Sequence, residues 1–168
     1  TDADLGDVLT YIISGGSDQS LFMIDNNTRV LSFVTAPNFE APGDTGANNF
    51  YNLQIQVTDS KNPVTQDLIV AVNNLNESPT DIILDSSSVD ENVPINTVIG
   101  AFSTTDPDSG NTFTYSLVGG GADNPVFSIV GNQLQINNSP DFETKSSYSI
   151  QVKTTDQDGL EFEKTRSE

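Results

Sequence analysis

The chain has no cysteine, no histidine and no tryptophan among its 168 residues. It therefore cannot form a disulfide bond, a thiolate or imidazole zinc site, or a catalytic centre that depends on cysteine or histidine. The absence of tryptophan also removes the side chain that most often stacks on sugars. The absence of cysteine does not indicate the cytosol, because large extracellular bacterial repeat proteins can build sufficient cores without disulfide bonds.

Basic residues are also scarce: six Lys and Arg stand against 24 Asp and Glu, for a formal net charge of -18. Such a charge argues against contact with phosphate backbones, so nucleic acid is excluded as a partner. No apolar run approaches the ~20 residues that a membrane span needs. The chain opens on Thr1-Asp2-Ala3-Asp4 and not on a basic and then apolar leader. We expect a segment of a longer secreted or cell-surface protein.

Scattered acidity usually only keeps a surface soluble, but here a sparse acidic signature occurs twice. The first copy begins Thr1-Asp2-Ala3-Asp4 and the second Thr105-Asp106-Pro107-Asp108, which places Asp106 104 residues after Asp2. The similarity continues downstream, where Phe22 matches Phe127, Asn38-Phe39-Glu40 matches Asp141-Phe142-Glu143, and Thr58-Asp59 matches Thr155-Asp156. A repeat of this length predicts two small domains in tandem.

Polar and apolar residues alternate along residues 52–58 and 148–153, as expected for half-buried strands. Gly, Asn, Asp and Pro clusters separate shorter strand-like runs at residues 9–13, 30–34, 65–72, 82–84, 98–103, 113–118 and 133–136. No segment has a convincing helical pattern. The sequence therefore predicts an all-β fold of tandem seven-stranded antiparallel Greek-key sandwiches, immunoglobulin-like but without the Cys and Trp hallmarks.

The predicted domain boundary lies in residues 72–79, where a β run stops and Pro79 blocks its continuation. We therefore predict domains at 1–77 and 78–168. The second domain has two strand candidates ahead of its acidic signature, and nothing before Thr1 matches them. The first repeat is expected to lack its opening strands, as in a fragment that is cut there or completed by another molecule. Residues 164–168 are more polar than residues 68–72, so we expect a last strand that is frayed or partly foreign.

The residue types in the acidic signature suit calcium, which takes six to eight oxygen ligands in flexible geometry. Asp106 and Asp108 send two carboxylates from nearby backbone, and Gly110 permits a tight turn. The helix-loop-helix calcium hand does not fit, because its sixth and twelfth positions, counted from Asp106, hold Asn111 and Leu117 instead of Gly and Glu. Turn-forming Asp in a polar loop is the alternative, and repetition of the pattern favours a metal.

Two further readings of the composition are less favoured. A glycosidase needs two carboxylates across a cleft, whereas Asp-x-Asp in a tight loop faces one point. A carbohydrate-binding module needs exposed rings, but all four Tyr recur in repeat-matched pairs, as do Phe22 with Phe127 and Phe39 with Phe142. We therefore predict that these aromatic side chains pack in the cores.

Together these features resemble the cadherin repeat, most closely its bacterial cadherin-like form. The resemblance rests on Val89-Asp90-Glu91-Asn92, on residues 106–111, on Asp141-Phe142-Glu143 and Thr155-Asp156, and on their partial counterparts in the first domain. Asn74-Leu75-Asn76-Glu77-Ser78-Pro79 stands where the family places its inter-repeat linker. The motifs cover nearly the whole chain in the family's order.

The resemblance implies calcium ions (Ca²⁺) between successive repeats, bound by the base of one repeat, the linker and the top of the next. The implied ligands at this junction are Glu40 and Asn38 from the first domain, Asn74, Asn76, Glu77 and the Ser78 carbonyl from the linker, and Asp106, Asp108, Asp156 and the Asn111 carbonyl from the second domain. Asp2, Asp4 and Asp59 at one end, and Glu91, Asp141 and Glu143 at the other, would form half-sites.

This chain departs from the family pattern at Asn38, Asn74 and Glu77, where the family has Asp. The two Asn residues remove formal charge around the ions on the base side. We therefore expect the site at Asp106, Asp108 and Asp156 to be the most complete.

The resemblance further implies a non-enzymatic, membrane-associated or secreted extracellular protein. Its expected function is adhesion, between cells or to a substrate, through junctions that calcium makes rigid. The expected partners are calcium, neighbouring repeats of the same protein, and a homophilic or polysaccharide ligand. A carbohydrate-binding module and a passive stalk spacer stay open as alternatives.

Overall fold

The computed structural model describes residues 8–59 and 61–167. Its internal contacts divide the chain into two compact units, Thr1–Leu75 and Asn76–Glu168, here called unit 1 and unit 2. The predicted domains at 1–77 and 78–168 remain a prediction. The two boundaries differ by Asn76 and Glu77, which the contacts assign to unit 2.

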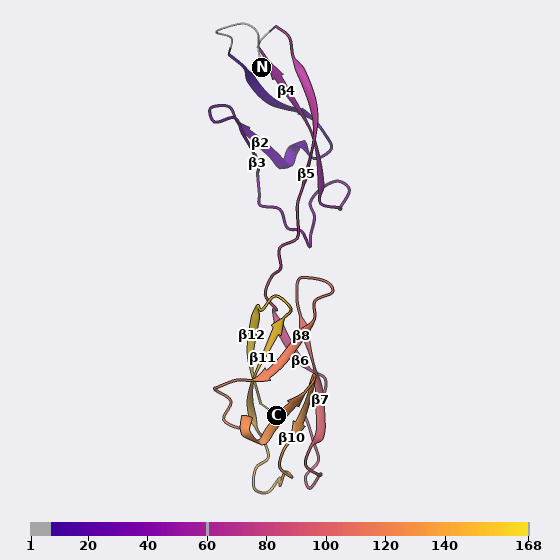
Figure 1. Cartoon of the computed structure of the whole chain (residues 1–168), viewed down its shortest axis with the longest axis vertical. Coiled ribbons are helices and arrows are strands. Elements are labelled where there is room, and N and C mark those ends of the chain that lie inside the picture. Colours follow the sequence, from indigo (N-terminus) through magenta and orange to yellow (C-terminus); the bar gives the residue numbers. More distant parts are fainter. Residues whose placement is uncertain (1–7, 60, 168) are drawn as a thin grey trace. The chain divides into compact units, whose positions relative to one another are not determined.

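Unit 2 is a sandwich of two antiparallel sheets (Figure 1). One sheet has the order β6-β7-β10-β9 and the other β12-β11-β8. The strands are β6 (Asp81–Leu84), β7 (Thr97–Thr105), β8 (Phe113–Leu117), β9 (Phe127–Val130), β10 (Gln133–Ile136), β11 (Ser149–Asp156) and β12 (Glu161–Ser167), with the short 3-10 helix η2 (Asn124–Val126) before β9. Seven strands in this order confirm the predicted Greek-key sandwich.

The core of unit 2 follows from the alternation of its strands. Ile150, Val152 and Thr154 on β11 are all 0% exposed, while the residues between them are half-buried. The Thr154 hydroxyl pairs with that of Thr104 at 2.8 Å, which satisfies its buried polar group. The other buried apolar residues of this core are Ile82, Leu84, Ile99, Phe102, Phe127, Leu134 and Ile136.

Unit 1 repeats part of this plan. Its strands are β1 (Thr10–Gly15), β2 (Phe22–Asp25), β3 (Val30–Phe33), β4 (Phe50–Thr58) and β5 (Val64–Ala71), with η1 (Gln19–Leu21) before β2. The sheet β1-β4-β5 matches β8-β11-β12, and β2-β3 matches β9-β10. Within the described residues of unit 1 nothing corresponds to β6 and β7, so the prediction that the first repeat lacks its opening strands is confirmed.

The reduced strand set leaves unit 1 with a small core. Its buried apolar side chains are Phe22, Tyr51 and Leu53. Phe33 packs against both aromatic rings, with centroid distances of 4.2 Å to Phe22 and 5.1 Å to Tyr51. Phe33 and Leu31 remain only partly buried, because no second strand covers this side of β3 among the described residues.

Two expectations about packing were wrong. The last strand is not frayed: β12 pairs with β11 from Glu161 to Ser167. Its half-buried Lys164 and Arg166 side chains donate to the Ile82 carbonyl of β6, which helps to hold the strand in place. Phe142 and Phe39 do not pack in the cores, since they are 64% and 36% exposed. Both follow the repeat pattern but lie in loops, after β10 and β3 respectively, beyond the end of the sheet ladder.

A buried carboxylate ties the loops of unit 1 together. Asp18 is 2% exposed and accepts hydrogen bonds from the Asn52 and Thr45 backbone N–H groups, both at 2.7 Å, and from the hydroxyls of Thr45 and Ser17. Burial raises the pKa of Asp18, but the hydrogen bonds outweigh it and lower the pKa from 3.8 to about 2. The charged form is therefore the one that stabilises the fold.

We expect unit 1 to lose stability as the pH falls from about 4 towards 2. The pKa of Asp18 is lower in the folded chain than in the unfolded chain, so its stabilising effect is complete above 3.8 and is lost as the pH falls through about 2. At neutral pH, Asp18→Asn should cost about 2 kcal/mol, the worth of hydrogen bonds to a charged group. Amide hydrogen exchange at Asn52 and Leu53 measures the stability lost in Asp18→Asn. The control is Asp67→Asn, which removes an exposed carboxylate of the same unit. Equal exchange rates in the two variants would contradict the prediction.

Candidate metal centre

Three acidic residues of unit 2 lie where strands end at the same edge of the sandwich. Asp106 and Asp108 follow β7, and Asp156 ends β11. Asp156 pairs with Phe113, the first residue of β8, so the loops before β8 and after β11 meet at this edge. Asp108 and Asp156 are only 7% and 6% exposed. Buried carboxylates of this kind require hydrogen bonds, ion pairs or a metal.

Local turns hold two of these carboxylates in place. The Asp108 backbone N–H donates to Asp106 Oδ1 at 2.9 Å. Asp156 Oδ1 accepts from the backbone N–H groups of Asp158 at 2.9 Å and Leu160 at 2.8 Å. Asp side chains favour such turns because they reach their own backbone a few residues onward. The loop sequences therefore fix the oxygen positions before any ligand binds.

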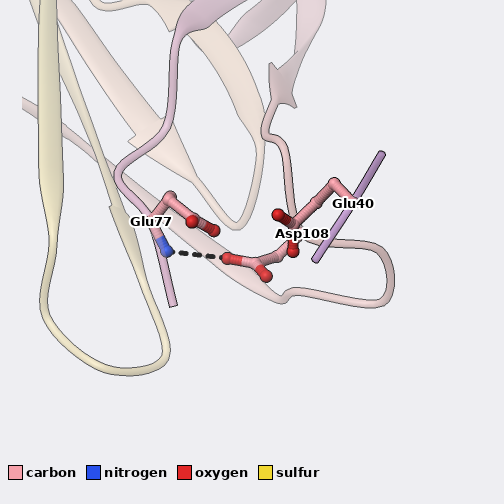
Figure 2. Close-up of side chains that lie close together, drawn as sticks. All are labelled: Glu40, Glu77 and Asp108. Atoms are coloured by element: carbon pink, nitrogen blue, oxygen red, sulfur yellow. Dashed lines mark hydrogen bonds between the residues drawn. The ribbon is translucent and has the colours of Figure 1, made fainter. Parts of the chain in front are cut away.

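The segment that enters unit 2 is hydrogen-bonded to the same carboxylates. The Glu77 backbone N–H donates to Asp108 Oδ2 at 2.8 Å, as the dashed line in Figure 2 shows. The Asn76 side-chain amide donates to Asp156 Oδ2 at 2.6 Å. Asn76 and Glu77 follow directly on Leu75, the last residue of unit 1. The carboxylate cluster thus anchors the residues that connect the two units.

The Asp106 carboxylate is only partly satisfied by hydrogen bonds. Its Oδ1 accepts from the Asn111 amide at 3.2 Å, whereas its Oδ2 is buried and, within residues 8–59 and 61–167, has no hydrogen-bond partner. A buried carboxylate oxygen without a partner is energetically costly. A cation beside Asp106 Oδ2 would remove that cost. The residues present therefore fit a hard, oxygen-seeking cation such as calcium.

The charge state of Asp156 suits a cation. Burial raises the pKa of Asp156, but the Asn76 side chain and the backbone N–H groups of Leu160, Asp158 and Gly159 donate to it and hold its pKa below the ordinary 3.8. The carboxylate is therefore charged at neutral pH, and calcium would displace no proton from it.

The remaining predicted ligands of the junction are placed within their own units. On unit 1, Asn38 and Glu40 are exposed after β3, and Asn38 Oδ1 accepts from the Glu40 backbone N–H at 2.8 Å. Asn74 is exposed near the end of unit 1, and Ser78 is exposed at the start of unit 2. Their participation in a calcium site stays a prediction.

Of the predicted half-sites, the set in unit 2 lies within the described residues, whereas only Asp59 of the other set does. Ligand oxygens of Glu91, Asp141 and Glu143 in unit 2 lie within 4.8 Å of one another, and all three residues are exposed. Asp59 lies after β4, where its Oδ1 accepts from the Lys61 and Asn62 backbone N–H groups at 2.7 and 2.8 Å. Asp2 and Asp4 lie outside the described residues. A metal-binding role for any of these groups stays a prediction.

Residues 85–167 match the family model described as cadherin domain. The chain is 32% identical to human protocadherin Fat 4 over 172 residues, an alignment that covers 93% of this chain and 3% of that protein. Similar solved structures are human protocadherin-24 EC1-2 (20% identity, TM-score 0.67, 97% of this chain and 79% of that chain) and Drosophila N-cadherin EC1-4 (17%, 0.71, 98% and 42%). These two structures support the fold alone. The chain belongs to the cadherin repeat family.

Membership of this family supports only a few statements about function. Cadherins are an adhesion-type family and not an enzyme family, and cadherin domains are extracellular in protocadherins. This chain spans only 3% of the length of Fat 4, and the named relatives are animal proteins, so the predicted bacterial type stays a prediction. The named relatives give no support for a polysaccharide partner. Within the described residues, no helix is long and apolar enough to span a membrane.

Proposed function

We propose that this chain is a pair of cadherin repeats of a cell-surface or secreted protein, in which calcium binds where the linker meets unit 2 and makes the junction rigid for adhesion. The observation that carries the proposal is the buried Asp106 Oδ2, which has no hydrogen-bond partner within the described residues. Asp106 is hydrogen-bonded to Asp108, and Asp108 in turn accepts from the linker residue Glu77. The proposed ligands in unit 2 are Asp106, Asp108 and Asp156 with Asn76, Glu77 and the carbonyls of Ser78 and Asn111. Glu40, Asn38 and Asn74 are the proposed contributions of unit 1.

The physical basis of the effect is charge. Two carboxylates about 5 Å apart repel by roughly 3 kcal/mol at an effective dielectric constant of about 20. Hydrogen bonds from Asn76 to Asp156 and from Glu77 to Asp108 offset part of this repulsion without metal. Calcium, when bound, supplies a double positive charge that attracts the surrounding oxygens. Because the anchored linker residues are covalently joined to unit 1, tighter anchoring restricts the segment between the units.

Calcium should therefore raise the melting temperature of unit 2, and magnesium should do so much less, because it requires a smaller octahedral site. Extracellular calcium modules typically have Kd values of about 10⁻⁴ to 10⁻³ M. A calcium concentration about 100 times Kd would stabilise the folded chain by about 2.7 kcal/mol. Thermal melts in calcium, magnesium and chelator measure the effect, and calorimetric titration gives Kd. Identical melts in calcium and chelator would contradict the proposal.

Two further measurements address rigidity and adhesion. Small-angle scattering should show a narrower range of inter-unit distances in calcium than in chelator. Beads coated with the whole chain should aggregate in calcium and disperse in chelator if the repeats bind homophilically. Rigidity without aggregation would favour the stalk spacer, and aggregation indifferent to calcium would contradict the calcium-dependent part of the proposal.

A further inference from the structure

Gln157 contacts the candidate centre although no sequence pattern marks it. Gly159, with φ of 90°, and the hydrogen bonds to Asp156 form a tight turn that fixes the Gln157 backbone. From this turn Gln157 Nε2 donates to Asn111 Oδ1 at 2.6 Å and to Asn76 Oδ1 at 3.3 Å. One side-chain amide thus joins the loop after β11 to the loop before β8 and to the linker.

The other end of the same amide group holds the backbone. Gln157 Oε1 accepts from the Thr112 backbone N–H at 2.9 Å. The Asn111 carbonyl and the Thr112 N–H belong to one planar trans peptide, in which they point in opposite directions. Fixing the direction of the Thr112 N–H therefore fixes the direction of the Asn111 carbonyl, which is one of the proposed calcium ligands. Gln157 therefore holds Asn111 in two ways: it donates to the Asn111 side chain, and it fixes the peptide plane between Asn111 and Thr112.

We infer that Gln157 is a positioning residue of the calcium site, an inference that rests on the proposed function. It acts through Asn111 and Asn76 and carries no charge of its own. Asn111 in turn donates to Asn76 Oδ1 and Asp106 Oδ1, both at 3.2 Å, so a displacement of Gln157 reaches both the linker and the carboxylates. Partners that orient metal ligands are typically worth 10- to 100-fold in affinity.

The first test is a calorimetric titration of the whole chain with calcium chloride. Gln157→Ala should raise Kd about 10-fold, with little change in the melting temperature in chelator because Gln157 is exposed. The control is Gln151→Ala on β11, whose amide donates to Glu163 at 2.8 Å and not to the cluster. Gln157→Glu keeps an acceptor for Thr112 but loses the donor to Asn111. It should also weaken binding, although its added negative charge alone would strengthen it.

The second test needs no metal. In chelator, the Thr112 amide of Gln157→Ala should exchange its hydrogen about fivefold faster than in the wild-type chain, since it loses one hydrogen-bond acceptor. An unchanged Kd in Gln157→Ala, tighter binding in Gln157→Glu, or unchanged Thr112 exchange would each overturn the inference while leaving the proposed function intact. A wild-type chain that binds no calcium would overturn the proposed function, and the inference with it.

Discussion

Asp108→Ala should remove most of the calcium-dependent rise in melting temperature. Asp108 is 7% exposed and its Oδ2 accepts from the Glu77 backbone N–H, so the substitution removes a proposed ligand and an anchor of the linker together. Outer partners of metal ligands are already worth 10- to 100-fold in affinity, and loss of a ligand should raise Kd at least about 10-fold. Calorimetric titration and melts in calcium and chelator measure the two effects.

Two further variants separate the roles of Asp108. Asp108→Asn keeps an oxygen that can accept from Glu77 but loses the negative charge, so it should melt like the wild-type chain in chelator and still respond weakly to calcium. Asp158→Ala removes an equal charge from the exposed position two residues after Asp156, and should retain most of the calcium response. A full calcium response in Asp108→Ala would show that the ion, if bound, is held elsewhere.

The grouping of the candidate residues was largely predictable, because acidic residues recur at matching strand ends of the two repeats. The structure brings Asp106, Asp108, Asp156, Asn76 and Asn111 into one hydrogen-bonded group with the Glu77 backbone. Their role as metal ligands stays a prediction. Gln157 was missed because an uncharged amide acts here through geometry, and its partners lie 46 and 81 residues away in the sequence.

The fold was predictable where strand-like runs are separated by clear turn residues or alternate between polar and apolar residues. β10 was predicted at residues 133–136, as observed, and the predictions for β7 and β8 differ from the structure by no more than two residues at either end. β2 and β9 were not predicted as strands, although the repeat linked Phe22 with Phe127. Neither Phe22-Met23-Ile24-Asp25 nor Phe127-Ser128-Ile129-Val130 alternates strictly between apolar and polar residues, whereas the equally short β10 does. Each pairs with the strand that follows it directly in the sequence, β2 with β3 and β9 with β10, so both pairs are local hairpins.

The core of unit 2 provides the largest expected effect on stability. Phe102 on β7 is 2% exposed, and its ring stacks on Tyr115 with a centroid distance of 5.5 Å. Phe102→Ala should destabilise unit 2 by about 3 to 5 kcal/mol, because the surrounding strands cannot close the cavity. Denaturant unfolding followed by amide signals of Ile150 and Val152 measures the loss.

Phe→Ala at an exposed position is the control that shows whether the loss of stability comes from burial of the ring. Phe142 is 64% exposed in the same unit, so Phe142→Ala should change the free energy of unfolding by no more than about 0.5 kcal/mol. Amide signals of Leu53 in unit 1 should be indifferent to both variants, since unit 1 has a separate core. If Phe102→Ala lowered the free energy of unfolding of unit 2 by less than about 1 kcal/mol, β7 would not be a central strand of that sandwich. The absence of a counterpart of β7 among the described residues of unit 1 would then not explain the small core of unit 1.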